Sequence, residues 1–261
     1  MNVLVCVVNE VRGVTRLNKL VYVVCHKSST ISRFSTTGEP LADINVKGLS
    51  RPRDIVACEG TSQLYVADCR IVRAGCVWRV SSDGADMKRW LPKSPSDTVK
   101  AYTLSVRATR LLVTSYGNKQ LIQFDATGDE VTRVPLPDYM SPLHAVESPT
   151  GTFIVSYKNT QQKQCQVSEV NTEGHVLFQF TGSLGLTPHI AVDSQGNIFV
   201  ADHDNRRILL LDAQLALRHV IIEGHQLNNE VPQRLCYMEQ SGQLLVGFAR
   251  RDVAVFDVLQ R

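Results

Sequence analysis

Residues 186–208 read LTPHIAVDSQGNIFVADHDNRRI, and this stretch decides the fold. It holds two short apolar runs, 190–192 and 198–201, joined by a Gly turn and followed by polar residues. Short apolar runs bounded by Gly, Asn and Asp are typical of β-strands. The second run has counterparts along the whole chain, which begin at Leu20, Leu64, Leu111, Phe153, Ile198 and Leu244.

These runs start about 42–47 residues apart, which is the repeat length of one four-stranded propeller blade. A shorter apolar segment precedes each run, and alternating segments follow it, so each repeat supplies four strands, a to d from the inside outward. The sequence therefore predicts an all-β chain, a single six-bladed β-propeller over residues 1–261 with four-stranded antiparallel blades. The expected blades are approximately 11–46, 47–92, 97–137, 138–181, 182–224 and 225–261 plus residues 2–8.

The last repeat lacks its outer strand. It has an a-strand near Arg234–Met238, a b-strand near Leu244–Ala249 and a c-strand near Val253–Val258, and the sequence stops at Arg261. A propeller must close its ring or leave an open blade edge. We therefore expect the apolar segment Asn2–Val8 to close the last blade as its outer strand.

Residues 186–208 also resemble an NHL repeat. The matching features are a Pro, Ile-Ala-Val-Asp, a Gly-Asn turn, Ile-Phe-Val-Ala-Asp and Asn-Arg-Arg-Ile. Residues 51–57 with 64–68 are a second good match, and the other repeats are degenerate. The resemblance implies an NHL-type propeller similar to the C-terminal domain of tripartite-motif proteins, which recognises proteins or RNA. No segment matches their RING, B-box or coiled coil.

Composition narrows the choice of function. The net charge is +3, well short of a dedicated nucleic-acid binder. The seven cysteines are scattered without a C-x-x-C pair, which favours free thiols in a reducing compartment, although Cys69 and Cys76 could bridge one hairpin. We expect a cytoplasmic protein, monomeric as an isolated domain, with no cofactor, no bound metal and no membrane span.

The longer connections of the repeats, between strands d and a and between b and c, share one face, and function usually lies on long loops. The hypothesis is a non-enzymatic binding platform that recognises a protein or peptide partner there. The candidate binding residues are Arg53, Arg70, Arg73, Lys119, Tyr139, Tyr157, Lys158, His189, His203, Arg206, Arg207, Phe248, Arg250 and Arg251.

Two alternatives stay open. Every b–c turn carries a basic residue, so neighbouring blades could form a basic arc with interleaved aromatic rings that binds single-stranded RNA. The opposing interpretation is that these Arg residues pair with nearby acids such as Asp202.

The other alternative is a metal-dependent lyase or hydrolase at the central channel. His144 and His189 are the best candidate ligands, yet aligning Ala145-Val146 with Ala191-Val192 puts the two imidazoles on opposite faces of their strands, which argues against a shared metal. The chain also contains no H-E-x-x-H, G-x-S-x-G, P-loop or EF-hand motif.

Overall fold

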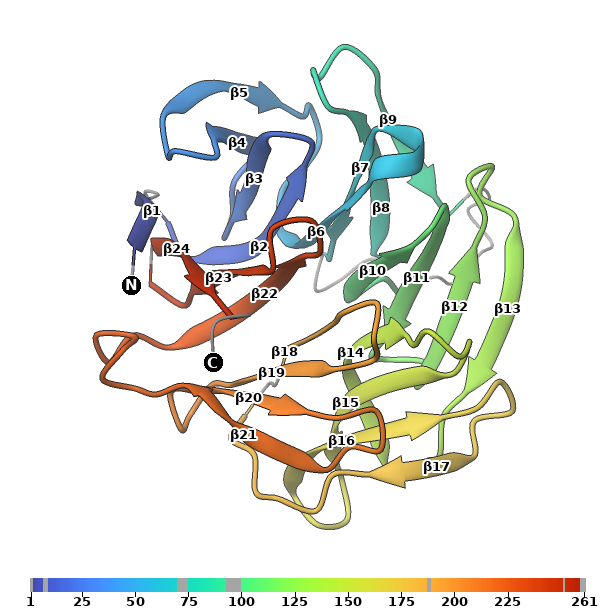
Figure 1. Ribbon diagram of the computed structural model, residues 1–261. Helices are drawn as coiled ribbons and strands as arrows, with labels where there is room; N and C mark the ends of the chain where they lie inside the picture. Colours follow the sequence, from blue (N-terminus) through green and yellow to red (C-terminus); the bar gives the residue numbers. More distant parts are fainter. Residues whose placement is uncertain are drawn as a thin grey trace.

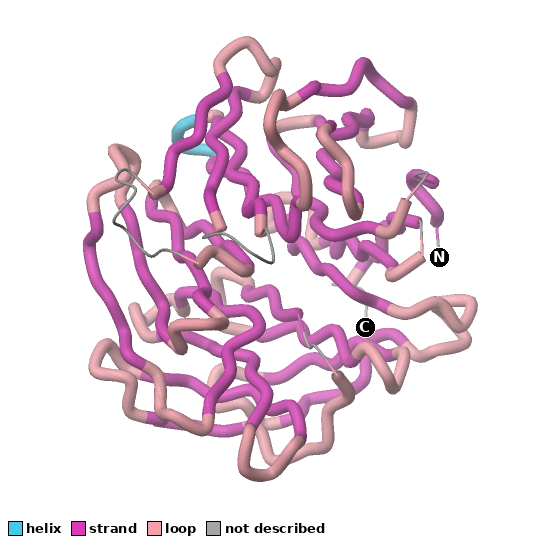
Figure 2. Tube along the Cα trace, turned by 180° about the vertical axis from the view of Figure 1, so that it is seen from behind, coloured by secondary structure: helices cyan, strands magenta, loops and turns pink. Residues whose placement is uncertain are grey.

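The computed structural model describes residues 2–6, 9–69, 75–92, 100–186, 189–250 and 252–258. These residues form six four-stranded antiparallel sheets arranged around a common centre, with almost no helix (Figure 1). The chain is thus a six-bladed β-propeller. Figure 2 shows strands and loops throughout the described part, apart from the short helical turn η1 (Glu59–Thr61).

In blades 1 to 5 the four strands follow one another in the sequence from the inside of the blade to the outside, and in blade 6 the outer strand is the N-terminal β1. Blade 1 is β2 (Val11–Leu17), β3 (Leu20–Cys25), β4 (Thr30–Ser35) and β5 (Pro40–Asn45). Blade 2 is β6 (Pro52–Cys58), β7 (Gln63–Asp68), β8 (Cys76–Ser81) and β9 (Met87–Leu91). Blade 3 is β10 (Thr103–Arg107), β11 (Arg110–Ser115), β12 (Gln120–Phe124) and β13 (Glu130–Pro135).

The second half of the ring repeats this order. Blade 4 is β14 (Met140–Glu147), β15 (Phe153–Asn159), β16 (Gln164–Val170) and β17 (Val176–Gln179). Blade 5 is β18 (His189–Val192), β19 (Ile198–Asp202), β20 (Arg207–Leu211) and β21 (Leu217–Ile222). Blade 6 is β22 (Pro232–Met238), β23 (Gln243–Phe248), β24 (Asp252–Asp257) and β1 (Asn2–Cys6).

The N-terminal strand closes the ring, as predicted. β1 pairs with β24 in antiparallel register, from Asn2 opposite Val255 to Cys6 opposite Asp252. Val7 and Val8, which the sequence also assigned to this strand, lie outside the described residues. The strands β1 and β24 therefore share one sheet, and Figure 1 shows them side by side in one blade.

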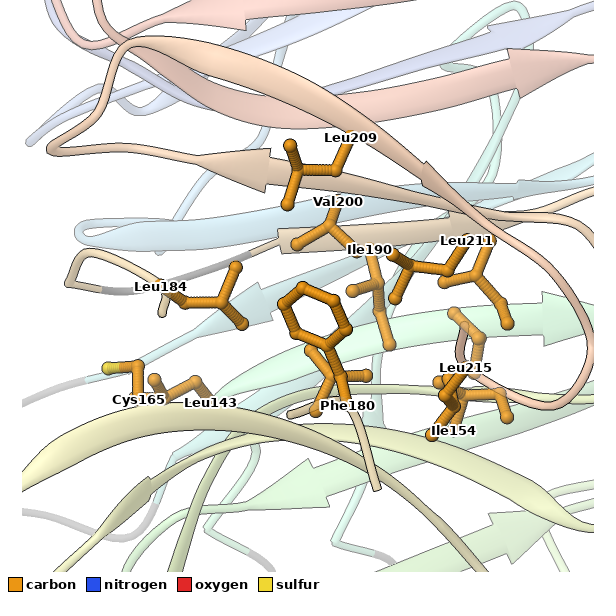
Figure 3. Close-up of a cluster of buried hydrophobic side chains, with 13 residues drawn as sticks. Leu143, Ile154, Cys165, Phe180, Leu184, Ile190, Val200, Leu209, Leu211 and Leu215 are labelled. Carbon is orange, nitrogen blue, oxygen red and sulfur yellow. The ribbon is translucent and has the colours of Figure 1, made fainter. Parts of the chain in front are cut away.

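The core consists of six apolar clusters, one between each pair of adjacent blades. Figure 3 shows the cluster between blades 4 and 5, where Phe180 lies among Leu143, Ile190 and Leu211. The b-strands are flanked by blades on both faces, so their residues are almost all buried and their sequences read as continuous apolar runs. The outer strands face solvent, and β17 is exposed at all four residues.

The six cysteines whose side chains the structure describes are free, so Cys69 and Cys76 do not form a disulfide. Among the described residues, there is no helix with the length and apolarity needed to cross a membrane.

Ring closure by β1 yields a stability prediction. Deleting residues 2–6 exposes the edge of β24 and removes its backbone pairing, at about 1 kcal/mol for each lost hydrogen bond. We expect the free energy of unfolding, measured by urea denaturation, to fall by several kcal/mol. The matched control is a permuted chain in which residue 2 follows residue 261, so that β1 follows β24 as an ordinary hairpin. Equal stability of the deletion and the parent would contradict closure by β1.

Candidate functional site

Each innermost strand presents one residue at the same height on the propeller axis. Each of these residues pairs with an equivalent position of strand b, near the end of that strand. We call them the axial ring: Gly13, Asp54, Thr103, His144, His189 and Arg234. All six are buried, although four of the six residues carry strongly polar side chains.

A β-bulge precedes the ring position in four of the blades and leaves backbone carbonyls without a strand partner. The bulged residues are Arg12, Arg53, Leu143 and Gln233. Buried carbonyls need donors, because an unpaired one loses its hydrogen bonds to water without compensation.

Ring side chains supply these donors. Arg234 donates from Nε to Arg12 O (2.5 Å), from Nη1 to Gln233 O (2.8 Å) and from Nη2 to Arg53 O (3.2 Å). Thr103 Oγ1 donates to Leu143 O over 2.7 Å. The ring therefore connects blade 6 to blades 1 and 2, and blade 3 to blade 4.

Other ring side chains accept the backbone N–H that follows a ring position. Asp54 accepts from Ile55 N (3.0 Å) and from Leu104 N (2.8 Å). His144 Nδ1 accepts from Ile190 N at 3.4 Å, and His189 Nδ1 accepts from Leu235 N at 3.3 Å.

Together with the hydrogen bonds that Arg234 and Thr103 donate to backbone carbonyls, these contacts join the inner strands of neighbouring blades around the axis. Gly13 has no side chain, and a Cβ there would lie 2.6 Å from Ile55 N, so β2 and β6 approach each other directly.

Burial controls the charge of the ring. Desolvation raises the pKa of Asp54 to about 6, and the Arg234 guanidinium, 3.9 Å away, opposes this rise. Desolvation lowers the pKa of His144 to about 3 and holds the pKa of His189 well below its usual value. Both imidazoles are therefore neutral at physiological pH.

The structure corrects the expected orientation of the two histidines. Their rings stack with centroids 3.7 Å apart, so they do not point to opposite faces. His144 pairs with Ser156 and His189 with Ala201, at the same height, because each lies three residues before the last paired residue of its strand, Glu147 in β14 and Val192 in β18. Ala145 is therefore equivalent to Ile190 and not to Ala191, so the alignment of the two strands in the sequence was wrong by one residue.

Asp54, His144 and His189 place ligand-type atoms within 4.8 Å of one another, which raises the question of a metal site. A neutral imidazole has one nitrogen lone pair, and a metal ligand must offer it. In both histidines this lone pair, at Nδ1, accepts a backbone N–H, and His144 Nε2 donates to Leu104 O at 3.1 Å. The three residues therefore do not fit a metal ion without breaking the bonds between the inner strands.

A cavity of about 270 Å³, which we call the axial well, lies on one side of the ring, with Asp54, His144 and His189 at its inner end. It extends along the inner strands toward the turns between strands a and b. A second cavity of about 640 Å³, the vestibule, adjoins it there and shares Arg16, Glu59 and Arg107 with it. Both cavities lie on the face opposite to the one predicted to bind.

The predicted face, which carries the long d–a and b–c connections, presents a stack of three side chains. The Arg53 guanidinium lies 4.5 Å from the centroid of the Tyr102 ring and hydrogen-bonds the Tyr102 hydroxyl. The Tyr102 ring in turn lies 5.3 Å from the Tyr116 ring, and Tyr116 is 43% exposed. We call these residues the Arg–Tyr stack.

Three predicted binding residues, Tyr157, Phe248 and His189, are buried, so their assignment to the surface is wrong. Tyr157 is 1% exposed, and its hydroxyl bonds Ser168 Oγ at 3.1 Å. Phe248 is fully buried in the cluster between blades 5 and 6. Both belong to b-strands, which are covered on both faces. Tyr139 is half-buried, with its ring 6.4 Å from that of Tyr157, and His189 belongs to the axial ring.

Three described basic residues of the predicted arc have acidic partners, and so does His203. Arg207 Nε contacts the buried Asp202 at 2.8 Å, His203 Nδ1 contacts Asp204 at 2.7 Å, and Lys119 lies 3.6 Å from Asp138. Arg250 lies 3.8 Å from Glu230. Lys158 and Arg206 are exposed, whereas Arg70, Arg73 and Arg251 lie outside the described residues.

The role of Asp54, Thr103 and Arg234 was missed at the level of sequence. A weak signal exists, because Pro52, Pro142 and Pro232 each precede a ring residue by two positions. Counting from the Pro, instead of from the Ala-Val pair, would have aligned Asp54, His144 and Arg234.

No protein-family model matches the chain, and no curated protein matches it either. Solved structures with a similar fold exist at low identity. One is a catalytically inactive virginiamycin B lyase from Staphylococcus aureus with quinupristin, at 12% identity and a TM-score of 0.67, covering 94% of this chain and 79% of that one.

Two further neighbours have other roles. Hydrazine synthase of Kuenenia stuttgartiensis has 14% identity and a TM-score of 0.68, with 96% of this chain and 84% of that one covered. A nidogen/laminin complex contains a chain with 15% identity and a TM-score of 0.64, with 83% and 81% covered. At these identities the similarity shows the fold alone.

The axial ring predicts a large effect of Arg234→Met, which removes three hydrogen-bond donors and leaves Asp54 without its cation. We expect a loss of about 3–5 kcal/mol in the free energy of unfolding, measured by chemical denaturation. Arg218→Met, at an exposed ion pair with Asp212, is the control and should cost less than about 1 kcal/mol. Similar losses in the two variants would refute the role of the ring.

The ring also predicts a pH dependence. Depressed histidine pKa values mean that stability is lost as pH falls below 6.5, because the unfolded chain binds two protons that the folded chain does not. The raised Asp54 pKa acts oppositely: its stabilisation is present below pH 3.8 and is lost as pH rises through about 6. Between these values the net difference is one proton, so these groups make stability rise by about 1.4 kcal/mol per pH unit.

Asp54→Asn removes the opposing group, so we expect the slope of unfolding free energy against pH, between about pH 4 and 6, to increase by about 1.4 kcal/mol per pH unit. Urea denaturation at several pH values measures both slopes. Parallel slopes in the parent and the variant would mean that Asp54 is not protonated in this range in the folded chain.

Proposed function

We propose that this propeller is a non-enzymatic recognition domain that binds a protein partner through the face carrying its long d–a and b–c connections. The observation that carries this proposal is the Arg–Tyr stack, in which Arg53, Tyr102 and Tyr116 are held together at that face.

The composition of the stack suits protein recognition. Tyr and Arg are enriched among the residues that contribute most to protein–protein binding. Tyr116 offers an exposed ring, while Tyr102 is fixed below it by the Arg53 guanidinium and by its own backbone N–H, which bonds Thr114 O at 2.9 Å. A ring that is already held in place loses little conformational entropy when a partner covers it.

The charge distribution favours a protein over RNA as the partner. Affinity for a phosphate backbone comes from cations that release counterions, and Lys119, Arg207 and Arg250 already face Asp138, Asp202 and Glu230. The net charge of +3 points the same way. RNA binding by the remaining cations is therefore the second outcome that the test must distinguish.

The absence of catalysis is part of the proposal. The most polar cluster on the axis uses both imidazole lone pairs for backbone hydrogen bonds, which supports a structural role for His144 and His189. The structural neighbours include a lyase and a chain from a protein complex, and the proposed role of this chain is protein binding, as in the complex.

We also propose that the propeller is of the NHL type, because residues 186–208 resemble an NHL repeat.

Tyr116→Ala tests the binding face. We expect it to weaken capture of a specific protein partner from cell extract by at least about tenfold, the effect of losing a central aromatic contact. The control is Leu217→Ala on the outer strand β21, since Leu217 is 50% exposed and Tyr116 is 43% exposed. Both variants should melt like the parent.

The capture experiment has three possible results. A protein that the parent and Leu217→Ala capture and Tyr116→Ala loses supports the proposal. Identical capture profiles for all three chains contradict it. Binding of a single-stranded RNA pool that weakens steeply with salt would instead support recognition by the basic arc.

A further inference from the structure

The axial well has a polar inner end, narrow walls of small residues and a charged mouth. The wall residues stand two positions after the ring residues in each inner strand, on the same side of the strand. They are Thr15, Val56, Ser105, Val146, Ala191 and Cys236. Because none of the six is large, they leave the cavity of about 270 Å³ beside the axis.

The charges around the well nearly balance. Three carboxylates line it, those of Asp54, Glu59 and Glu147, together with the guanidiniums of Arg16 and Arg107. Two cations pair with these acids from beside the well: Arg234, 3.9 Å from Asp54, and Arg110, 2.6 Å from Glu147. A charged ligand would disturb this balance in a partly dehydrated space, where the penalty is larger than in water.

One buried polar group at the inner end of the well lacks a partner among the described residues. His189 is 6% exposed, and its Nε2 makes no hydrogen bond there. Because Nδ1 accepts from Leu235 N, the neutral ring carries its proton on Nε2, which makes this group a donor. A buried donor without an acceptor is unfavourable, so an acceptor that enters the well and reaches it is favoured.

From these observations we propose that the axial well binds an uncharged, polyhydroxylated small molecule of about monosaccharide size, which enters from the a–b turn face through the vestibule. A hydroxyl group both donates and accepts, so it can bridge the Asp54 carboxylate and the His189 N–H. The Thr15 and Ser105 hydroxyls on the walls offer further mixed contacts. The well and the vestibule together have the size and the convergent polar groups typical of ligand sites.

This site is independent of the proposed protein-binding face. The axial ring separates it from the Arg–Tyr stack, because the well begins at Asp54 and extends away from Arg53 along β6. Loss of one activity should therefore leave the other intact.

The test is titration of the full chain with D-glucose, D-gluconate and D-glucosamine, followed by calorimetry and by the imidazole ¹⁵N signal of His189. We expect saturable one-to-one binding of D-glucose that shifts the His189 signal, and binding at least about tenfold weaker for the anionic and cationic analogues. No glucose binding, or tighter binding of either charged analogue, would overturn the proposal.

Two variants locate the site. Ser105→Leu fills the well and should abolish glucose binding, whereas Ser241→Leu, at an exposed position on the same face, should leave it unchanged. If Ser105→Leu does not fold, Arg107→Met at the mouth takes its place, with an expected loss of about tenfold in affinity. Parent-like binding in the folded well variant would place glucose elsewhere and refute the assignment.

Discussion

The backbone groups of the innermost strands face the propeller axis, where no further strand can pair with them. The axial ring meets this constraint with side chains: Arg234 and Thr103 donate to carbonyls, while Asp54, His144 and His189 accept amide protons. Each of these five side chains makes at least one bond to a neighbouring blade, so the same contacts that satisfy the backbone also hold the blades in a ring. The apolar clusters between blades pack around this hydrogen-bonded centre.

This use of polar side chains determines what the axis can do. His144 and His189 resemble part of a catalytic or metal-binding set, but the lone pair of each imidazole accepts a hydrogen bond from a backbone N–H. Burial keeps both histidines neutral. The two faces of the ring consequently differ. One carries the Arg–Tyr stack and the long connections, and the other opens into the axial well. Under the two proposals above, a single propeller would offer a surface for a protein partner and a cavity for a small molecule.

The blade count and the closing strand could be predicted because they follow from repeating apolar runs and from the strand missing in the last repeat. The axial ring could not, because its register depends on how each inner strand pairs with strand b, which the apolar pattern does not mark: Ala145 lies at the height of Ile190, although the sequence aligns it with Ala191. Burial of Tyr157 and Phe248 was missed for a related reason, since b-strands are covered on both faces up to their ends. Neutralisation of Arg250 by Glu230 depends on contact between two separate loops.

The tautomers of His144 and His189 test the role of the ring most directly, because they report where each lone pair is used. Long-range ¹H–¹⁵N NMR correlation of histidine-labelled protein distinguishes the two ring nitrogens. Both residues should be neutral near pH 7, with the proton on Nε2 and the lone pair on Nδ1, and should stay neutral when the solution is acidified to pH 5. A proton on Nδ1, or titration of either ring near pH 6.5, would show that these side chains do not accept the backbone amides of the neighbouring blades.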